Sequence, residues 1–305
     1  MGRYLIKRLL QAPLVLFVLV TISFFLMRAA PGGPFTRERS GDARSEQARA
    51  QRWGLDKPLP TQYLLFLGRL ARGDLDYSMK QEDERVSERI ARHLPVSLLL
   101  GSLALGLALL LGISAGVIAA MRRNRLPDHL AMLVAMIGLA VPAFVIGPLL
   151  AWGFGLRLGW LPVAGYDGWL HLVLPAVTLA LPYAARIARL CRAGMLDVIN
   201  QDFVRTARAK GLSELAVVAR HVLRGGLLPV VSYLGPAATD VLTGSLVVEA
   251  IFRIPGMGYE FVNGALNRDY TVVMGTVVVY GALLVAFNLL SDLVYGLLDP
   301  RVRHA

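Results

Sequence analysis

The sequence has little cysteine and lacks several common catalytic motifs. Its single cysteine, Cys191, excludes an internal disulfide and a four-cysteine metal site. None of the five histidines is followed by glutamate, so the His-Glu-x-x-His pair of zinc peptidases is missing. None of the four lysines follows a glycine, so the chain lacks the Walker A loop that binds ATP. If ATP powers this protein, another subunit must bind the nucleotide.

Charged residues are also scarce, at 17% of the 305 residues, whereas hydrophobic residues make up 55%. This composition is too apolar for an ordinary soluble domain and indicates an integral membrane protein. Five runs without Asp, Glu, Lys or Arg are 18 to 29 residues long, and a helix needs roughly 20 apolar residues to cross a bilayer core. The runs cover residues 9–27, 93–121, 129–156, 168–185 and 270–291.

A sixth apolar segment, residues 227–252, is interrupted by Asp240 and Glu249 but is long enough to span the membrane. All these segments are continuous and do not alternate like barrel strands, which favours helices. The first run is expected to stay as an uncleaved anchor, because cleavage after Ala30 would place Arg28 where a small residue is needed. We therefore predict an all-α integral membrane protein with six transmembrane helices.

The basic residues predict how these helices are oriented. Outside the long hydrophilic segment 28–94, 19 Lys and Arg residues remain, and 16 of them fall on one side of the six predicted spans. By the positive-inside rule, both termini and the basic stretch 186–224 are expected to be cytoplasmic. Topology and contact with anionic lipid thus account for the net charge of +11, and we expect no nucleic-acid partner.

The chain divides into three regions: residues 1–27 with the first span, an external loop at 28–94, and a core at 95–305 with the other spans. The loop has 13 basic and 10 acidic residues, a mixture that indicates partial folding. Its residues 63–70 carry apolar side chains on consecutive turns, which predicts a short amphipathic helix. Two interpretations stay open for this helix, a docking or gating element and a structural cover.

Glycines and prolines recur within the predicted spans. Small residues allow helices to approach closely in lipid, and proline removes a backbone donor and kinks a helix. The positions concerned are Gly101, Gly106, Gly112 and Gly116 in the second span, Pro142 and Pro148 in the third, and Pro175 and Pro182 in the fourth.

Residues 112–116, Gly-Ile-Ser-Ala-Gly, match the nucleophile elbow of serine hydrolases. That motif requires a strand-to-helix turn, whereas Ser114 lies inside an uncharged helical run. We interpret Gly112 and Gly116 as a packing face instead. An intramembrane hydrolase is retained as an alternative that would depend on Ser114.

The basic segment 202–229 separates two apolar spans and predicts two helices joined at Gly211. Gly211 suits a helix C-terminus, and Ser213 can cap the next helix with Glu214 in its first turn. On that helix the predicted apolar face comprises Leu212, Leu215, Val218, Ala219 and Val222, with Arg220 and Arg224 directed elsewhere. Such a segment could present its elbow to a soluble partner or anchor the loop to anionic lipid.

This segment resembles the EAA loop of ABC importer permeases, in the form found in the peptide, opine and nickel branch. The resemblance rests on Arg-Thr-Ala-Arg-Ala-Lys-Gly-Leu at 205–212, then His221, Leu223 and Arg224, then Leu-Leu-Pro at 227–229. The chain departs from the general EAA pattern, because Arg205 stands at its glutamate and Arg224 at its proline. Further matches to the first transmembrane subunit of oligopeptide permeases occur at 30–35, 54–63, 73–74, 115–120, 160–162, 244–258, 261–270 and 298–301.

The resemblance implies a type I importer permease fold and a loop at 191–229 whose elbow couples the chain to a cytoplasmic ATPase. The implied coupling residues are Arg205, Thr206, Ala207, Arg208, Ala209, Lys210, Gly211, Leu212 and Ser213, with Arg208 and Lys210 as contacts to acidic groups. The implied partners are a second homologous permease, two ATPase subunits holding ATP and Mg²⁺, an external substrate-binding protein, membrane lipid and a peptide. The chain itself would bind no cofactor or metal and catalyse no reaction.

Three carboxylates fall within predicted spans, where each is costly and needs a partner or water. Asp240, Glu249 and Asp292 are therefore candidates for lining a translocation path. Asp240 lies deepest and could attract the amino terminus of a peptide, or it could be structural. Glu249 could instead order the loop that follows it by accepting hydrogen bonds from backbone amides. Dipeptide, glutathione and nickel permeases share these motifs, so they remain alternative functions.

Overall fold

The computed structural model describes residues 2–30, 32–35 and 43–298, and places the side chains of residues 10–30, 32–35, 47–241 and 245–290. Within these residues the protein is helical and contains no strand, only one isolated bridge between Tyr77 and Arg85. The all-α prediction is confirmed. The helices are α1 (Gly2–Ala29), α2 (Ala43–Arg52), α3 (Leu59–Leu70), α4 (Val86–Met121), α5 (Leu126–Ala140), α6 (Ala143–Leu150), α7 (Val173–Ile199), α8 (Asp202–Ala209), α9 (Glu214–Val217), α10 (Leu223–Gly226), α11 (Leu228–Phe252), α12 (Met257–Asn267) and α13 (Tyr270–Leu298).

Three short segments interrupt the α-helical pattern. Residues Ala151–Arg157 (η1) and Val218–Val222 (η3) are π-helical, and Trp169–Leu172 (η2) is a 3₁₀ turn before α7. Four helices are long and apolar enough to cross a membrane, and two bent pairs raise the number to six if each pair is one span. The predicted third span is broken, because its two halves, Leu126–Ala140 and Ala143–Arg157, meet at an angle of 106°.

Proline explains where the third span breaks, whereas the fourth span continues as a helix through Pro182. Pro142 is the N-cap of α6, in extended conformation, so the α5 hydrogen-bond ladder cannot continue through it. The kink predicted there is confirmed. By contrast, α7 runs without interruption from Val173 to Ile199 and contains Pro182. Pro175 lies in its first turn, where a helix has no intrahelical partner for the backbone N–H.

The core is built where small residues let α4 and α7 pack closely. A Cβ atom on Gly112 would lie 2.7 Å from the Ala184 carbonyl oxygen, and one on Gly116 would lie 2.6 Å from Cys191 Cβ. The predicted close packing of α4 is thus confirmed for Gly112 and Gly116, but it was wrong for Gly106, which is exposed and where an added Cβ atom would meet nothing within 4 Å. Ser114 lies on the exposed face of the same continuous helix, without the strand-to-helix turn of a hydrolase elbow.

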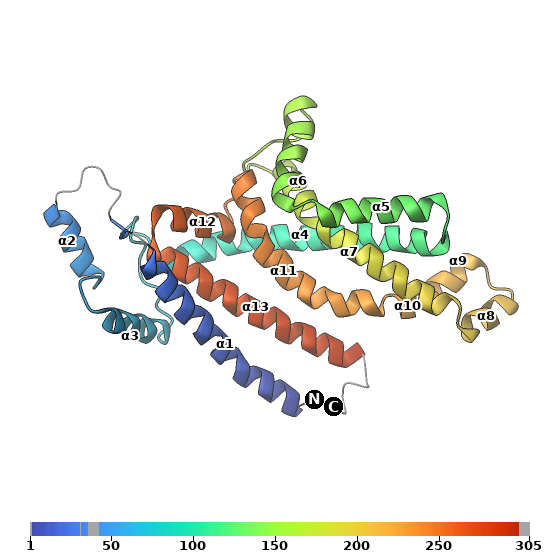
Figure 1. The fold of residues 1–305 in the computed structure, drawn as a ribbon, viewed down its shortest axis with the longest axis horizontal. Coiled ribbons are helices and arrows are strands. Elements are labelled where there is room, and N and C mark those ends of the chain that lie inside the picture. Colours follow the sequence, from blue (N-terminus) through green and yellow to red (C-terminus); the bar gives the residue numbers. More distant parts are fainter. Residues whose placement is uncertain (1, 31, 36–42, 299–305) are drawn as a thin grey trace.

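Along the long axis of the molecule, α2, α3 and α12 lie at one end and α8 and α9 at the other (Figure 1). Helices α4, α5, α7 and α11 run between these ends, and α1 lies beside α13. The predicted amphipathic helix at 63–70 is present as the second half of α3. The basic segment 202–226 turns sharply near α8 and α9, and we call this segment the elbow. The end of the molecule that contains it is the elbow end, and the opposite end, with α2, α3 and α12, is the far end.

Candidate coupling and translocation sites

The elbow of residues 202–226 is a sharp turn between two short helices. Helix α8 ends at Ala209, and Gly211 follows with a φ of +78°, in the left-handed region that glycine adopts without steric cost. The Ser213 hydroxyl then accepts a hydrogen bond from the Ala216 backbone N–H at 3.4 Å and caps α9. Both predicted features of this turn are confirmed.

An ion pair spans the turn from one helix to the other. The Arg208 Nε atom lies 2.8 Å from a Glu214 carboxylate oxygen, and both side chains are exposed. Arg208 is therefore engaged within the elbow, whereas Lys210 lies exposed at the end of α8. Exposed pairs of this kind contribute roughly 0 to 1 kcal/mol, so Arg208 can exchange Glu214 for another carboxylate at little cost.

The apolar face of the second elbow helix differs from the predicted one. Val217, Val218 and Val222 are buried, whereas Leu215 is 82% exposed and Ala219 is also exposed. The prediction was wrong for Leu215 and Ala219 because it assumed 3.6 residues per turn, and the π segment Val218–Val222 has more residues in each turn. The result is an exposed leucine at the tip of the elbow, beside the Arg208–Glu214 pair.

The elbow is joined tightly to α7 through two glycines. A Cβ atom on Gly194 would lie 2.3 Å from the Gly226 carbonyl oxygen, and one on Gly226 would lie 2.7 Å from Met195 Cγ. Neither position can hold a larger residue unless the backbone moves. Movement of the elbow must therefore be passed to α7, because packed interiors deform little.

A buried ion pair joins α5 to α7 near the same end. The Asp128 carboxylate is 1% exposed and lies 2.6 Å from Arg192 Nε and 2.7 Å from Arg192 Nη2. Asp128 also accepts a hydrogen bond from the Asn124 backbone N–H at 2.9 Å. Such a bidentate pair fixes the relative position of two helices in a way that a single contact cannot.

The nine predicted coupling residues all lie in this elbow, but they differ in exposure. Ala207 is buried and Leu212 is half-buried, so these two side chains hold the elbow together. The others are exposed: Arg205, Thr206, Arg208, Ala209, Lys210, Gly211 and Ser213. Two of them contact Asp202, because the Arg205 guanidinium lies 3.5 Å from its carboxylate and the Thr206 hydroxyl donates to its carbonyl oxygen at 3.0 Å.

The three predicted path carboxylates are in different environments. Asp240 is exposed at the middle of α11. Glu249 is fully buried at the far end of α11, and its Oε2 atom accepts hydrogen bonds from the backbone N–H groups of Gly258 (2.8 Å) and Tyr259 (3.4 Å). Asp292 falls on α13 among residues whose side chains lie outside the described part of the structure.

Glu249 thus anchors the start of α12, where a helix N-terminus favours a negative charge. The two glycines of the Ile-Pro-Gly-Met-Gly stretch make room for it, since a Cβ atom on Gly256 would lie 2.3 Å from Glu249 Oε2. One on Gly258 would lie 2.3 Å from Leu246 Cα. This geometry matches the interpretation in which Glu249 orders the loop that follows α11.

Two further buried carboxylates at the far end, and Asp128 near the elbow, were not predicted from the sequence. Glu260 binds the Arg89 guanidinium at 3.0 Å and lies 3.4 Å from His93 Nε2. Asp269 accepts hydrogen bonds from the backbone N–H groups of Met79 and Val272, both at 3.2 Å. The contacts with Arg89 and Met79 are far apart in the sequence, so no local pattern could have identified them, whereas the contact from Val272 to Asp269 is a local helix cap at the start of α13.

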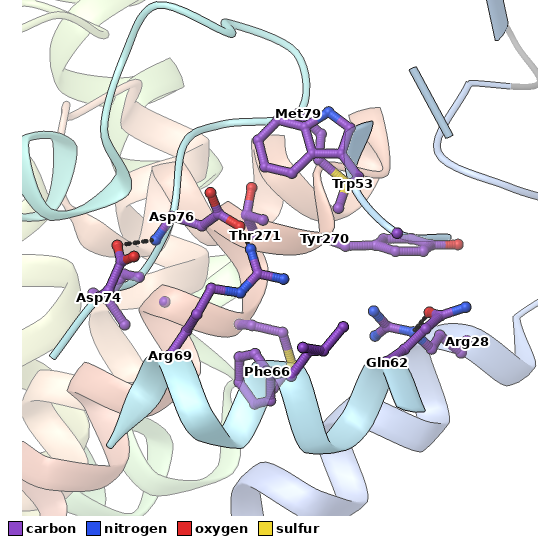
Figure 2. Close-up of a pocket in the computed structure, with 15 residues that line it drawn as sticks. Arg28, Trp53, Gln62, Phe66, Arg69, Asp74, Asp76, Met79, Tyr270 and Thr271 are labelled. Atoms are coloured by element: carbon purple, nitrogen blue, oxygen red, sulfur yellow. Dashed lines mark hydrogen bonds and ion pairs between the residues drawn. The ribbon is translucent and has the colours of Figure 1, made fainter. Parts of the chain in front are cut away.

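These contacts join the loop of residues 28–94 to α12 and to the start of α13 at the far end. A small cavity of about 40 Å³ lies between α1, α3 and α13. Around it, Arg28 Nε donates to Gln62 at 2.9 Å, and Arg69 pairs with Asp76 (Figure 2). The cavity has room for little more than one water molecule. Among the residues whose placement is described, no group of His, Cys, Asp and Glu could hold a metal ion.

Comparisons with known proteins place this architecture. Residues 112–304 match the family described as binding-protein-dependent transport system inner membrane component, and residues 1–101 match its N-terminal counterpart. The oligopeptide transport system permease protein OppB of Haemophilus influenzae is 44% identical over 100% of both chains. The same protein of Escherichia coli K12 is 45% identical over 100% of both chains.

A dipeptide transport system permease protein, DppB of Bacillus subtilis, is 41% identical and covers 99% of this chain and 98% of its own. Among solved structures, an inward-facing MetNI methionine ABC transporter matches 69% of this chain and 96% of its own. Its TM-score is 0.59 at 16% identity. At that identity the match shows the fold alone.

Proposed function

This chain belongs to the inner membrane components of binding-protein-dependent transport systems, and we propose that it is the permease subunit of an ATP-driven peptide importer. The observation that supports this function best is full-length identity of 44–45% to oligopeptide permease proteins. The chain is a multi-pass inner membrane protein and a transport subunit. The Bacillus subtilis relative supports dipeptides as a second substrate class.

In this proposal the elbow of residues 202–226 is the contact with a cytoplasmic ATPase. The exposed Leu215 and the exchangeable Arg208–Glu214 pair offer one apolar anchor and one charged group side by side. A central apolar anchor ringed by polar contacts is typical of protein interfaces. Residues 205–213 form the turn, and the Gly194–Gly226 contact carries its movement into α7.

The partners are a second homologous permease, two ATPase subunits that bind ATP and Mg²⁺, and an external substrate-binding protein. The elbow end and both termini are cytoplasmic, as the basic residues predict. When the two ATPases close on ATP, the elbows move together and the bundle opens toward the far end to accept peptide. Hydrolysis and separation of the ATPases return the bundle to its inward-open state.

We propose that the exposed carboxylate of Asp240 faces the path between the two permeases, and Asp292 on α13 stays a candidate for the same path. Glu249 is buried against the start of α12. We propose that it affects the path only indirectly, by holding α12 in place at the far end. A charged side chain inside a membrane protein generally faces a cavity or a partner.

The proposal is tested by purifying the tagged chain in mild detergent from its native membrane. We expect a second permease and ATPase subunits, identified by mass, and ATP hydrolysis in the purified material. Replacing Gly211 by valine should remove the ATPase subunits, because a β-branched residue is strained at a φ of +78° and the elbow must distort.

The matched control is Gly159→Val. Gly159 also has a positive φ, +64°, and open space around it, but it lies outside the elbow. This variant should keep its ATPase subunits. A wild-type preparation without any associated ATPase would contradict the proposed function, and equal loss in both variants would show that the elbow has no special part in assembly.

A further inference from the structure

A long groove runs along α7, which packs against both α5 and α11. The groove has a volume of about 810 Å³, within the range of about 300–1,000 Å³ typical of small-molecule sites. Its α5 side is apolar and includes Met132 and Leu139, whereas its α7 side carries three arginines at three-residue spacing. These are Arg186, Arg189 and Arg192.

Two of these arginines are available to a ligand. Arg192 is held by Asp128, but no ion pair forms to Arg186 or Arg189 within the described part of the chain. Both are exposed, and the Arg186 guanidinium carbon lies 5.5 Å from the centre of the Tyr233 ring. Contact with an aromatic ring restricts a guanidinium, and its N–H groups that point away from the tyrosine can still bind a carboxylate in the guanidinium plane.

Helix α11 carries the opposite charge about one turn beyond the residues that line the groove. Pro229, Tyr233 and Pro236 line the groove, and Asp240 lies four residues beyond Pro236 on the same helical face. Asp240 lies seven positions after Tyr233, which corresponds to a rise of about 10 Å along α11.

We propose that this groove binds a short peptide in transit, with its carboxylate at Arg186 and Arg189 and its amino group toward Asp240. The inference rests on the proposed peptide transport and adds an orientation and a preferred length. An extended chain spans at most about 3.3–3.6 Å per residue, so a tripeptide covers about 10 Å. Because Arg186 stacks on Tyr233, the rise from Tyr233 to Asp240 sets the scale of the separation between the arginines and Asp240, and this scale fits a zwitterionic peptide of about three residues.

Membrane topology and anionic lipid would each account for only part of the groove. A role in membrane topology requires positive charge on the part of α7 toward the elbow end. It does not require the contact of Arg186 with Tyr233. An anionic lipid headgroup would bind the arginines but would leave Asp240, about one turn beyond the groove on α11, without a role. A molecule with separated positive and negative ends matches both the arginines and Asp240.

The test uses the complete complex in proteoliposomes, with the binding protein preloaded at saturation so that uptake reports the steps after capture. Uptake of labelled trialanine is compared with that of its C-terminal amide and its N-acetyl form. One charge-assisted contact gives a difference of about tenfold or more, so wild-type uptake should favour the free carboxylate by about tenfold. In the double variant Arg186→Gln and Arg189→Gln this preference should fall to about one.

Asp240→Asn should keep the preference for the free carboxylate and lose the preference for the free amine. The control double variant Arg122→Gln and Arg123→Gln removes two exposed arginines that the groove does not include, and should retain both preferences. Unchanged preferences in the groove variants of an active importer would overturn the inference and leave the proposed function standing. The inference would also be overturned if the preference for the free carboxylate were lost only when anionic lipid is present in the vesicles. If the wild-type importer hydrolyses ATP but takes up none of the peptides, the proposed function is refuted instead.

Discussion

Replacing Leu215 with aspartate is expected to weaken binding of the ATPase subunits at least about tenfold and to lower ATP-driven uptake in parallel. Leu215 is 82% exposed at the tip of the elbow. Burying a leucine in an interface contributes about 1.5–3 kcal/mol, a factor of roughly ten to one hundred and fifty. Aspartate loses that contribution and would also place an unpaired charge in the contact. Titration of detergent-purified permease with isolated ATPase subunits gives the change in Kd.

Leu126→Asp is the matched control for this change. Leu126 is 71% exposed, also lies toward the elbow end, and stands outside the elbow. An aspartate there falls at the start of α5, where negative charge is favourable, so binding of the ATPase should be unchanged. Equal Kd values for wild type and Leu215→Asp would mean that the exposed leucine contacts lipid or nothing.

Replacing Asp128 with alanine is expected to lower the free energy of unfolding by about 3 kcal/mol. Breaking one side of a buried ion pair typically costs about 3–5 kcal/mol, because the remaining charge stays desolvated without a partner. The lower value applies since the Arg192 side chain is 26% exposed and can reach water. Denaturant unfolding in detergent micelles, followed by tryptophan fluorescence, measures the change as a shift in midpoint.

The exposed pair of Asp202 and Arg205 provides the comparison. Its side chains are 97% and 72% exposed, so Asp202→Ala should leave the unfolding midpoint nearly unchanged. A double variant that exchanges the charges, Asp128→Arg with Arg192→Asp, should recover part of the lost stability. If Asp128→Ala unfolds at the wild-type midpoint, the ion pair does not hold α5 against α7.

Hydropathy and spacing predicted much of this architecture because lipid imposes simple rules. Each backbone group in a membrane must be paired within the protein, so long uncharged runs become helices. The elbow was predictable for a local reason, since Gly211 and Ser213 satisfy the ends of adjacent helices. The glycine face of α4 followed from the need for close approach between helices in lipid.

Other features depend on contacts that no local pattern contains. The exposure of Leu215 depends on the π segment that follows it, and the sequence alone does not reveal that change of period. The partner of Asp128 is 64 residues away, and that of Glu260 is 171 residues away. Pro142 predicted a kink, but the angle of 106° depends on how α6 packs against α7 and α11.

The most direct test of the central claim, that the elbow contacts an ATPase, is photo-cross-linking from position 215. Cys191 is the single cysteine in the sequence and is fully buried, so Leu215→Cys supplies one accessible thiol in this chain. A photoreactive maleimide attached to that thiol, in a complex with cysteine-free partners, should give a product with the combined mass of this chain and one ATPase subunit. Products with lipid or the second permease only, from a complex that still contains the ATPase, would contradict the claim.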